Sequence, residues 1–200
     1  MAIAHFITHP EVVIDPTVPV TAWPLSSEGI RRTRMMLGQP WVARVRAIFC
    51  SAEQKARDTA GIMADHLSLL PVVIDGLGEN ERSATGYLQK VEFEVVADQF
   101  FGRPAESVRG WERAIDAQAR IVGAVDRAIS MAPEDGDIAI ISHGGVGALL
   151  LCHLKGVPIS RTEDQPAGGG GNVFWFETTT RRLLTGWRRI DEQAPVCRPV

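Results

Sequence analysis

The sequence predicts a three-layer α/β sandwich in which helices flank a mostly parallel central sheet. Three observations support this fold class. Short apolar segments alternate with amphipathic helical ones, the segment at residues 138–141 is apolar on both faces, and 45% of the 200 residues are hydrophobic. Such alternation is typical of α/β domains. Because a chain of this length buries roughly 70% of its extended surface, we expect a single domain over residues 1–200.

The first half of the chain alternates strand and helix signals. An apolar start predicts a strand that Pro10 ends, and Ser26–Ser27 supply an N-cap for a helix that reaches Met36. Ser51 is expected to cap the helix after a second strand, and Pro71 favours an edge position for a third strand. The expected strands are residues 2–7, 46–50 and 72–74, and the second helix includes residues 56–66.

The second half begins with a less regular segment. Residues 75–107 are rich in Gly, Glu and Phe, and we interpret them as an insertion or lid that covers a site. Apolar residues at helical spacing then predict a long helix from Val108 through Trp111 to Ile129. The remaining expected elements are a strand at residues 138–141, a helix at 144–154, and strands at 173–177 and 183–187.

The composition excludes several classes of protein. The chain carries 21 basic and 24 acidic residues, a net charge of −3, which argues against a nucleic-acid partner. No apolar run approaches the ~20 residues that span a bilayer, and the first residues lack the basic start of a signal peptide. We therefore expect no membrane partner and a cytoplasmic location. Cys50 and Cys152 lie in apolar surroundings and are interpreted as small buried hydrophobes.

Two histidines come directly after predicted strands. His9 follows the first strand, and His143 follows the central strand, where Gly144–Gly145 open a helix. Lys55 and Arg57 lie in the first turns of the helix after the second strand. Ligands bind beyond the carboxyl ends of such strands, and a helix N-terminus offers N–H groups to an anion. The sequence therefore predicts an anion site that contains both histidines.

These residue types suit phosphoryl transfer. That reaction needs an in-line nucleophile, positive charge around the phosphoryl oxygens, and an acid for the leaving group. Neutral imidazole is a competent nucleophile near pH 7, and either Glu79 or Glu81 supplies a carboxyl for the acid role. The strand ends carry no HxH or HxxxH pair, so a metal site is the weaker interpretation.

Five motifs occur in an informative order along the chain. They are His9, Pro24-Leu25-Ser26-x-x-Gly29, Ser51-x-x-x-Lys55-Ala56-x-x-Thr59-Ala60, Leu77-x-Glu79 and Ser142-His143-Gly144-Gly145. Together, their order and spacing resemble those of the histidine phosphatase superfamily, which has the phosphoglycerate mutase-like fold. The resemblance extends from about residue 3 to Arg188.

The resemblance implies a metal-independent enzyme with no cofactor and a small phosphorylated substrate. His9 matches the histidine that becomes transiently phosphorylated, and His143 matches the histidine that helps hold the phosphoryl oxygens. Glu79 matches the family's acid, with Glu81 as the alternative. The residues expected to contact the substrate are Thr8, Lys55, Arg57, Glu81, Arg82 and Gly144.

The chain departs from the family pattern beside the nucleophile. Thr8 replaces an arginine, Pro10 replaces a glycine, and Lys55 replaces a second arginine. Losing a preorganised charged contact commonly costs about 3 kcal/mol in the transition state, or ~100-fold in rate. Arg57 and Arg82 are candidates to supply the missing charge from other directions.

Three hypotheses for function follow. The first is a phosphatase that forms a phosphohistidine at His9. The second, favoured by Thr8 and Pro10, is a degenerate member that binds phosphorylated ligands or a partner protein without turnover. The third is a phosphoglycerate mutase, which requires more positive charge than the motifs contain.

The segment from Glu79 to Ser107 is expected to select the substrate. Its aromatic residues and Trp111 either form an apolar lid or pack the segment onto the long helix, and packing is the favoured interpretation. These residues are Tyr87, Phe93, Phe100 and Phe101. Apolar residues on helical faces also allow a homodimer.

Overall fold

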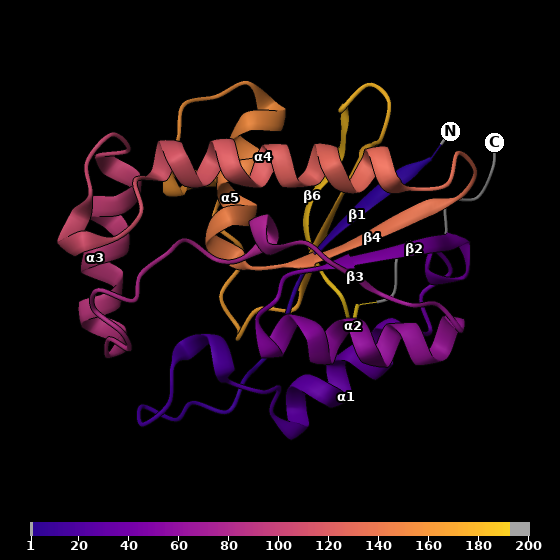
Figure 1. Ribbon diagram of the computed structural model, residues 1–200, viewed down its shortest axis with the longest axis horizontal. Helices are drawn as coiled ribbons and strands as arrows, with labels where there is room; N and C mark the ends of the chain where they lie inside the picture. Colours follow the sequence, from indigo (N-terminus) through magenta and orange to yellow (C-terminus); the bar gives the residue numbers. More distant parts are fainter. Residues whose placement is uncertain (1, 193–200) are drawn as a thin grey trace.

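A six-stranded mixed sheet runs through the computed structural model, which describes residues 2–192 (Figure 1). Its strands are β1 (Ile3–Thr8), β2 (Val45–Cys50), β3 (Val72–Val73), β4 (Asp137–Ser142), β5 (Asn172–Glu177) and β6 (Leu183–Arg189). Their order is β3-β2-β4-β1-β5-β6. The first four in this order are parallel, whereas β5 pairs antiparallel with both β1 and β6. This arrangement confirms the predicted, mostly parallel sheet.

Helices cover both faces of the sheet. They are α1 (Ser27–Met36), α2 (Gln54–Leu67), α3 (Lys90–Gly102), α4 (Ala114–Met131) and α5 (Gly144–Lys155). Figure 1 shows α1 and α2 on one face and α4 and α5 on the other, with α3 beyond the end of the sheet opposite the start of β1. Short 3-10 helices lie at Val20–Ala22, Val42–Arg44, Asp75–Leu77, Val108–Gly110 and Arg161–Glu163. The three layers match the expected α/β sandwich.

Strand β4 lies at the centre of the core. All six of its residues are buried. Ile138 and Ile140 pack into the cluster that contains Leu150 of α5, whereas Ile141 packs into the opposite cluster with Ala60 of α2. Successive side chains of a strand point to opposite faces. The run that is apolar on both faces was therefore correctly predicted to be a doubly covered strand.

The starts of α1 and α2 differ in how they are capped. The Ser26 hydroxyl accepts a hydrogen bond from the Gly29 N–H at 3.0 Å, as predicted for an N-cap. The N-cap of α2 is Glu53, so the prediction for Ser51 is wrong by two residues. Ser51 instead accepts a hydrogen bond from the Glu53 N–H at 3.2 Å and contacts His143. Its hydroxyl therefore belongs to the site and not to the cap.

Two helices depart from the sequence prediction. The irregular segment contains the 13-residue helix α3, which has no side-chain N-cap and leaves Val91 and Val95 exposed, so its sequence carries only a weak amphipathic signal. Helix α4 begins at Ala114, and the predicted start at Val108 is wrong. Arg109 and Gly110 adopt φ values of 51° and 83°, in the left-handed region that interrupts a helix.

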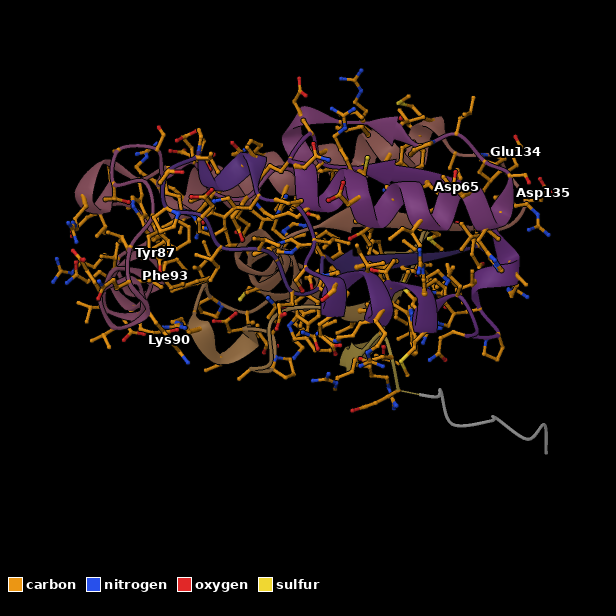
Figure 2. All side chains as sticks on the ribbon, turned by 90° about the horizontal axis from the view of Figure 1, so that it is seen from below. Asp65, Tyr87, Lys90, Phe93, Glu134 and Asp135 are labelled. Atoms are coloured by element: carbon orange, nitrogen blue, oxygen red, sulfur yellow. The ribbon has the colours of Figure 1, made fainter. Side chains whose placement is uncertain are left out.

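Most aromatic residues of the segment pack into the molecule. Phe100, Phe101 and Trp111 are buried in one cluster with residues of α4 and α5, including Leu149. Tyr87 is 39% exposed. Figure 2 shows Tyr87 beside Phe93 and Lys90 at the α3 end of the molecule, far from Asp65, Glu134 and Asp135. The favoured packing interpretation therefore holds for the three buried rings.

The two cysteines in apolar surroundings match their prediction. Cys50 and Cys152 are buried and free, as predicted, and Cys197 lies outside the described residues. Among residues 2–192, no helix has both the length and the apolar character needed to cross a bilayer.

Helix α3 should depend on Phe100 for its attachment to the domain. Phe100 is 1% exposed, and Phe100→Ala removes a buried ring, so we expect a loss of about 3–5 kcal/mol in the free energy of unfolding. Val91 lies on the same helix at 81% exposure, and Val91→Ala should change it by less than about 0.5 kcal/mol. Urea denaturation measures both values, and similar losses in the two variants would contradict this packing.

Candidate active site

The carboxyl ends of β1 and β4 bring the two predicted histidines together. Thr8 and Ser142 are register partners in the parallel pair, and the next N–H, that of His9, donates to the Ser142 carbonyl oxygen at 3.2 Å. His9 and His143 therefore leave adjacent strands at the same level. Their ring centroids are 5.2 Å apart.

The hydrogen bonds of His9 define its free nitrogen. Its Nδ1–H donates to the Pro10 carbonyl oxygen at 2.8 Å. A carbonyl only accepts, so Nδ1 carries the proton and Nε2 keeps a lone pair. Desolvation by the surrounding protein and repulsion from His143 lower the pKa of His9 to about 3. The ring is thus neutral at pH 7 and chemically competent as a nucleophile.

His143 is fully buried next to a carboxylate. Its Nε2 lies 2.9 Å from the Ser51 hydroxyl and 3.4 Å from Glu53 Oε1. Burial lowers the pKa of His143 to about 3, although Glu53 opposes this shift. Nδ1 of the ring is buried without a hydrogen-bond partner among the described residues.

Glu79 occupies the N-terminus of α5. Its carboxylate accepts hydrogen bonds from the Gly145 N–H at 3.1 Å and the Val146 N–H at 3.0 Å. The unpaired N–H groups and dipole of a helix N-terminus favour an anion there. A Cβ on Gly145 would lie 2.7 Å from Glu79 Oε1, so glycine is required for this close approach. Glu81, the alternative acid, is exposed and accepts from the Ser83 N–H at 2.6 Å.

Glu53, which was not predicted from the sequence, neutralises the charge of Lys55. Lys55 is 3% exposed, forms an ion pair with Glu53, and donates to the Val20 carbonyl oxygen at 2.8 Å. Burial of Glu53 opposes its ionisation. The effect of burial is outweighed by His143, Lys55 and the Glu79 N–H, which together lower the pKa of Glu53 to about 2. Lys55 is therefore held beside the histidines as half of an ion pair.

A cavity of about 420 Å³ contains His9 and Glu79. Its other lining residues include Asn80, Arg82, Phe93, Gly144, Gly145, Arg161 and Gln165. A second cavity of about 540 Å³ adjoins it and shares Glu79, Asn80 and Arg82, while also containing Glu81. Neither cavity is lined by Lys55 or by Arg57, which lies exposed on α2.

Two arginines line the cavity of His9, and they differ in their charge partners. Arg161 forms ion pairs with Glu94 at 2.8 Å, Asp98 at 2.7 Å and Asp164 at 3.1 Å. The Arg82 guanidinium lies 5.1 Å from the Phe93 ring centroid and forms no ion pair within residues 2–192. Among the predicted cations, Arg82 is thus the one that lines this cavity and has no ion pair within residues 2–192. Arg161 was not predicted, because nothing in its local sequence points to the site.

Thr8 is buried beneath the cavity. Its hydroxyl donates to Gln165 Oε1 at 2.8 Å and accepts from the Asn172 N–H at 2.9 Å. Gln165 was missed by the sequence analysis, because it lies in a loop distant in sequence from every motif. Thr8 therefore does not line the cavity itself but contacts Gln165, which does.

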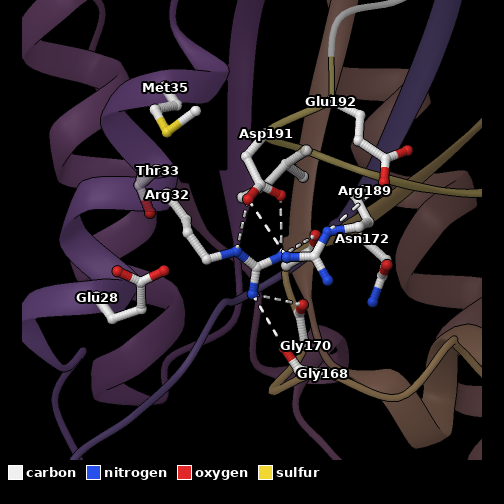
Figure 3. Close-up of polar contacts among 12 residues, drawn as sticks. Glu28, Arg32, Thr33, Met35, Gly168, Gly170, Asn172, Arg189, Asp191 and Glu192 are labelled. Atoms are coloured by element: carbon white, nitrogen blue, oxygen red, sulfur yellow. Dashed lines mark hydrogen bonds and ion pairs between the residues drawn. The ribbon is translucent and has the colours of Figure 1, made fainter.

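A glycine loop closes one side of the cavity. Arg32 of α1 donates to the carbonyl oxygens of Gly168, Gly170 and Gly171 at 3.0–3.2 Å and pairs with Asp191 at 3.1 Å (Figure 3). The Gly171 N–H in turn donates to the His9 carbonyl oxygen at 2.9 Å. Residues 168–171 all have positive φ values, which only glycine adopts freely. The loop is therefore fixed against His9.

The model of the histidine phosphatase superfamily (branch 1) matches residues 19–184, which include Glu79 and His143 and begin after His9. The chain belongs to the histidine phosphatase superfamily. This finding confirms the resemblance noted in the sequence.

Solved structures show the same fold. A mycobacterial glucosyl-3-phosphoglycerate phosphatase with inorganic phosphate aligns with TM-score 0.77 and 18% identity over 96% of this chain and 100% of that chain. Bacillus stearothermophilus YhfR aligns with TM-score 0.74 and 20% identity over 92% and 95%. A putative alpha-ribazole-5'-P phosphatase from Escherichia coli aligns with TM-score 0.70 and 17% identity over 96% and 97%. No match was found among curated proteins.

The buried histidine should make stability depend on pH. Folded His143 stays neutral down to a pKa of about 3, whereas the unfolded ring takes a proton near 6.5. Because the unfolded state then binds more protons, stability is lost as the pH falls below that value. The loss amounts to about 2 kcal/mol by pH 5. His143→Asn should therefore lose about 2 kcal/mol less than the wild type between about pH 7 and about pH 5 in urea titrations.

The matched control is His153→Asn, because His153 lies exposed on α5. This variant should keep the pH dependence of the wild type. The interpretation is wrong if His143→Asn keeps it as well.

Proposed function

We propose that the protein is a metal-independent phosphatase that hydrolyses a small phosphoester through a phosphohistidine at His9. The observation that carries this proposal is the position of His9 Nε2. It is unprotonated, belongs to a residue that lines the cavity, and lies in a ring 5.2 Å from that of His143. Proximity of this kind is what phosphoryl transfer to a side chain requires.

The first half of the reaction forms a bond from His9 Nε2 to phosphorus while the bond from phosphorus to the ester oxygen breaks. Glu79 takes up a proton from solvent before this step and gives it to the departing oxygen, which leaves as an alcohol. Glu79 lines the same cavity as His9. Gly144 and Arg82 line this cavity and are placed to stabilise the phosphoryl oxygens, and the His143 ring lies 5.2 Å from that of His9.

The second half regenerates the enzyme. The Glu79 carboxylate takes a proton from a water molecule, whose oxygen attacks phosphorus as the bond from Nε2 breaks. Inorganic phosphate leaves, and His9 returns to its neutral form. The same carboxyl thus acts first as an acid and then as a base.

The charge of the site favours a phosphatase over a mutase. A mutase must retain a bisphosphate, and among the residues that line the cavity of His9 only Arg82 and Arg161 are cationic, with Arg161 paired to three carboxylates. The structural relatives named as phosphatases agree with this choice, although they share only the fold with this chain.

Two observations favour the second candidate, a phospho-ligand-binding protein without turnover. Lys55 is neutralised by Glu53, and Thr8 supplies no charge at the first strand end. Titration calorimetry with vanadate, combined with the activity assays below, separates the candidates. Binding with no hydrolysis of any phosphoester would support the non-catalytic candidate.

His9→Ala should abolish hydrolysis of para-nitrophenyl phosphate, with a loss of at least about 10³-fold in kcat, because the nucleophile is gone. The wild type, quenched with denaturant during turnover, should carry acid-labile phosphate that the variant lacks. His153→Ala removes an exposed histidine and should retain full activity. Equal rates for wild type and His9→Ala would refute the proposal.

Glu79→Gln should show a loss that depends on the leaving group. With an alkyl phosphate, whose alcohol needs a proton to leave, we expect a decrease of about 10²–10⁴-fold in kcat/KM, which covers the steps up to release of the alcohol and not the later attack of water. With para-nitrophenyl phosphate the decrease should be much smaller, because nitrophenolate leaves without protonation. Glu81→Gln, the same change two residues further on, should retain activity on both substrates. A loss that is equal for both substrates would count against an acid role for Glu79.

A further inference from the structure

We infer that the side-chain amide of Gln165 is a phosphoryl-oxygen donor of this site, and that Thr8 is the positioning residue that orients it. This inference rests on the proposed function. It assigns a role to the threonine that occupies the first strand end, where a directly charged contact is absent.

Gln165 belongs to the site although it is far from the motifs in sequence. It lines the same cavity as His9 and Glu79. A Cβ on Gly144 would lie 2.1 Å from Gln165 Nε2, so the amide nitrogen sits directly over the first residue of α5. The absence of a side chain at Gly144 is what gives the amide this position, one residue after His143.

Thr8 determines which end of the amide faces the cavity. Its hydroxyl has one proton and accepts the Asn172 N–H at 2.9 Å. The nearest acceptor for that proton is Gln165 at 2.8 Å, whereas the Asn172 carbonyl oxygen is more distant at 3.4 Å. The Gln165 atom that faces Thr8 is therefore the oxygen Oε1.

A second donor holds the same orientation. Asn172 Nδ2 donates to Gln165 Oε1 at 3.0 Å. Two donors on one oxygen fix the amide, and no acceptor among residues 2–192 takes a hydrogen bond from Nε2. Thr8 and Asn172 are buried, so water competes weakly with these contacts. The two N–H bonds of Nε2 are left for a ligand in the cavity.

An acceptor-rich anion suits a donor placed in this way. The cavity carries little uncompensated positive charge, with Arg82 as its cation without an ion pair in the described part of the chain. A preorganised neutral donor needs no reorganisation when charge develops on a phosphoryl oxygen, and removing one such donor commonly lowers kcat by about 10²–10³-fold.

The sharpest test replaces the donor with an acceptor of the same shape. Gln165→Glu keeps one oxygen for Thr8 and Asn172 and places a second oxygen where Nε2 was. Repulsion should lower kcat/KM for para-nitrophenyl phosphate by at least about 100-fold near pH 7 and weaken competitive inhibition by inorganic phosphate. Activity should partly recover as the pH falls and the new carboxyl becomes protonated, because its O–H then donates a hydrogen bond to a phosphoryl oxygen. A merely structural role for Gln165 would give no such recovery.

The matched control is Gln89→Glu. Gln89 is exposed, its side chain caps no helix, and it lines neither of the cavities described above. The substitution therefore adds the same negative charge away from the site. This variant should retain wild-type kcat/KM and phosphate inhibition.

Two variants of Thr8 test the orienting hydroxyl. Thr8→Val keeps the shape but removes the proton that fixes Gln165 Oε1, and it should weaken phosphate inhibition with a smaller loss than Gln165→Glu. Thr8→Ser retains the hydroxyl and should restore inhibition toward the wild-type value. Thermal unfolding shows whether each variant is folded.

The outcomes separate this inference from the proposed function. If His9→Ala abolishes hydrolysis while Gln165→Glu keeps wild-type kcat/KM and phosphate inhibition, the inference alone is wrong. If the wild type hydrolyses nothing, calorimetry with inorganic phosphate still measures the Gln165 contact. Weaker binding to Gln165→Glu would then support the inference, and unchanged binding would overturn it.

Discussion

The parallel pairing of β1 with β4 is the constraint on which the rest of the site depends. The two strands end in register at Thr8 and Ser142, so the residues that follow them emerge side by side. The His9 N–H extends the ladder by one more bond to the Ser142 carbonyl oxygen. The backbone hydrogen bonds between β1 and β4 thus fix the separation of the two imidazoles. Helix α5 begins directly after His143, so its N-terminus lies at the same end of the sheet.

The site relies on fixed dipoles more than on free charges. Lys55 is compensated by Glu53, and Arg161 by three carboxylates, which leaves Arg82 against aromatic rings. The amide of Gln165 is held in place by Thr8 and Asn172 before any ligand arrives. Preorganised donors in a partly enclosed cavity act strongly because they need not reorient.

The sequence was sufficient for elements whose signal is local. The doubly apolar β4 and the Ser26 cap were predicted because each depends on a few neighbouring residues. The convergence of His9 and His143 could be predicted because parallel strands end at one edge. Helix α3 was missed because its apolar residues are divided between buried and exposed faces. The roles of Lys55 and Gln165 depend on partners that only the fold supplies: Glu53 turns back onto Lys55, and Gln165 is brought to Thr8 across 157 residues.

The contacts of Arg32 have a consequence for the order of folding. This arginine joins α1 to carbonyl oxygens 136–139 residues later and to Asp191, 159 residues later. Contacts between such distant parts of a chain form slowly, because the entropy of closing a long loop must be overcome first. The glycine loop beside His9 is therefore completed only when both ends of the described chain have come together. A nascent chain released before residue 168 would contain both histidines and still lack one wall of the cavity that contains His9.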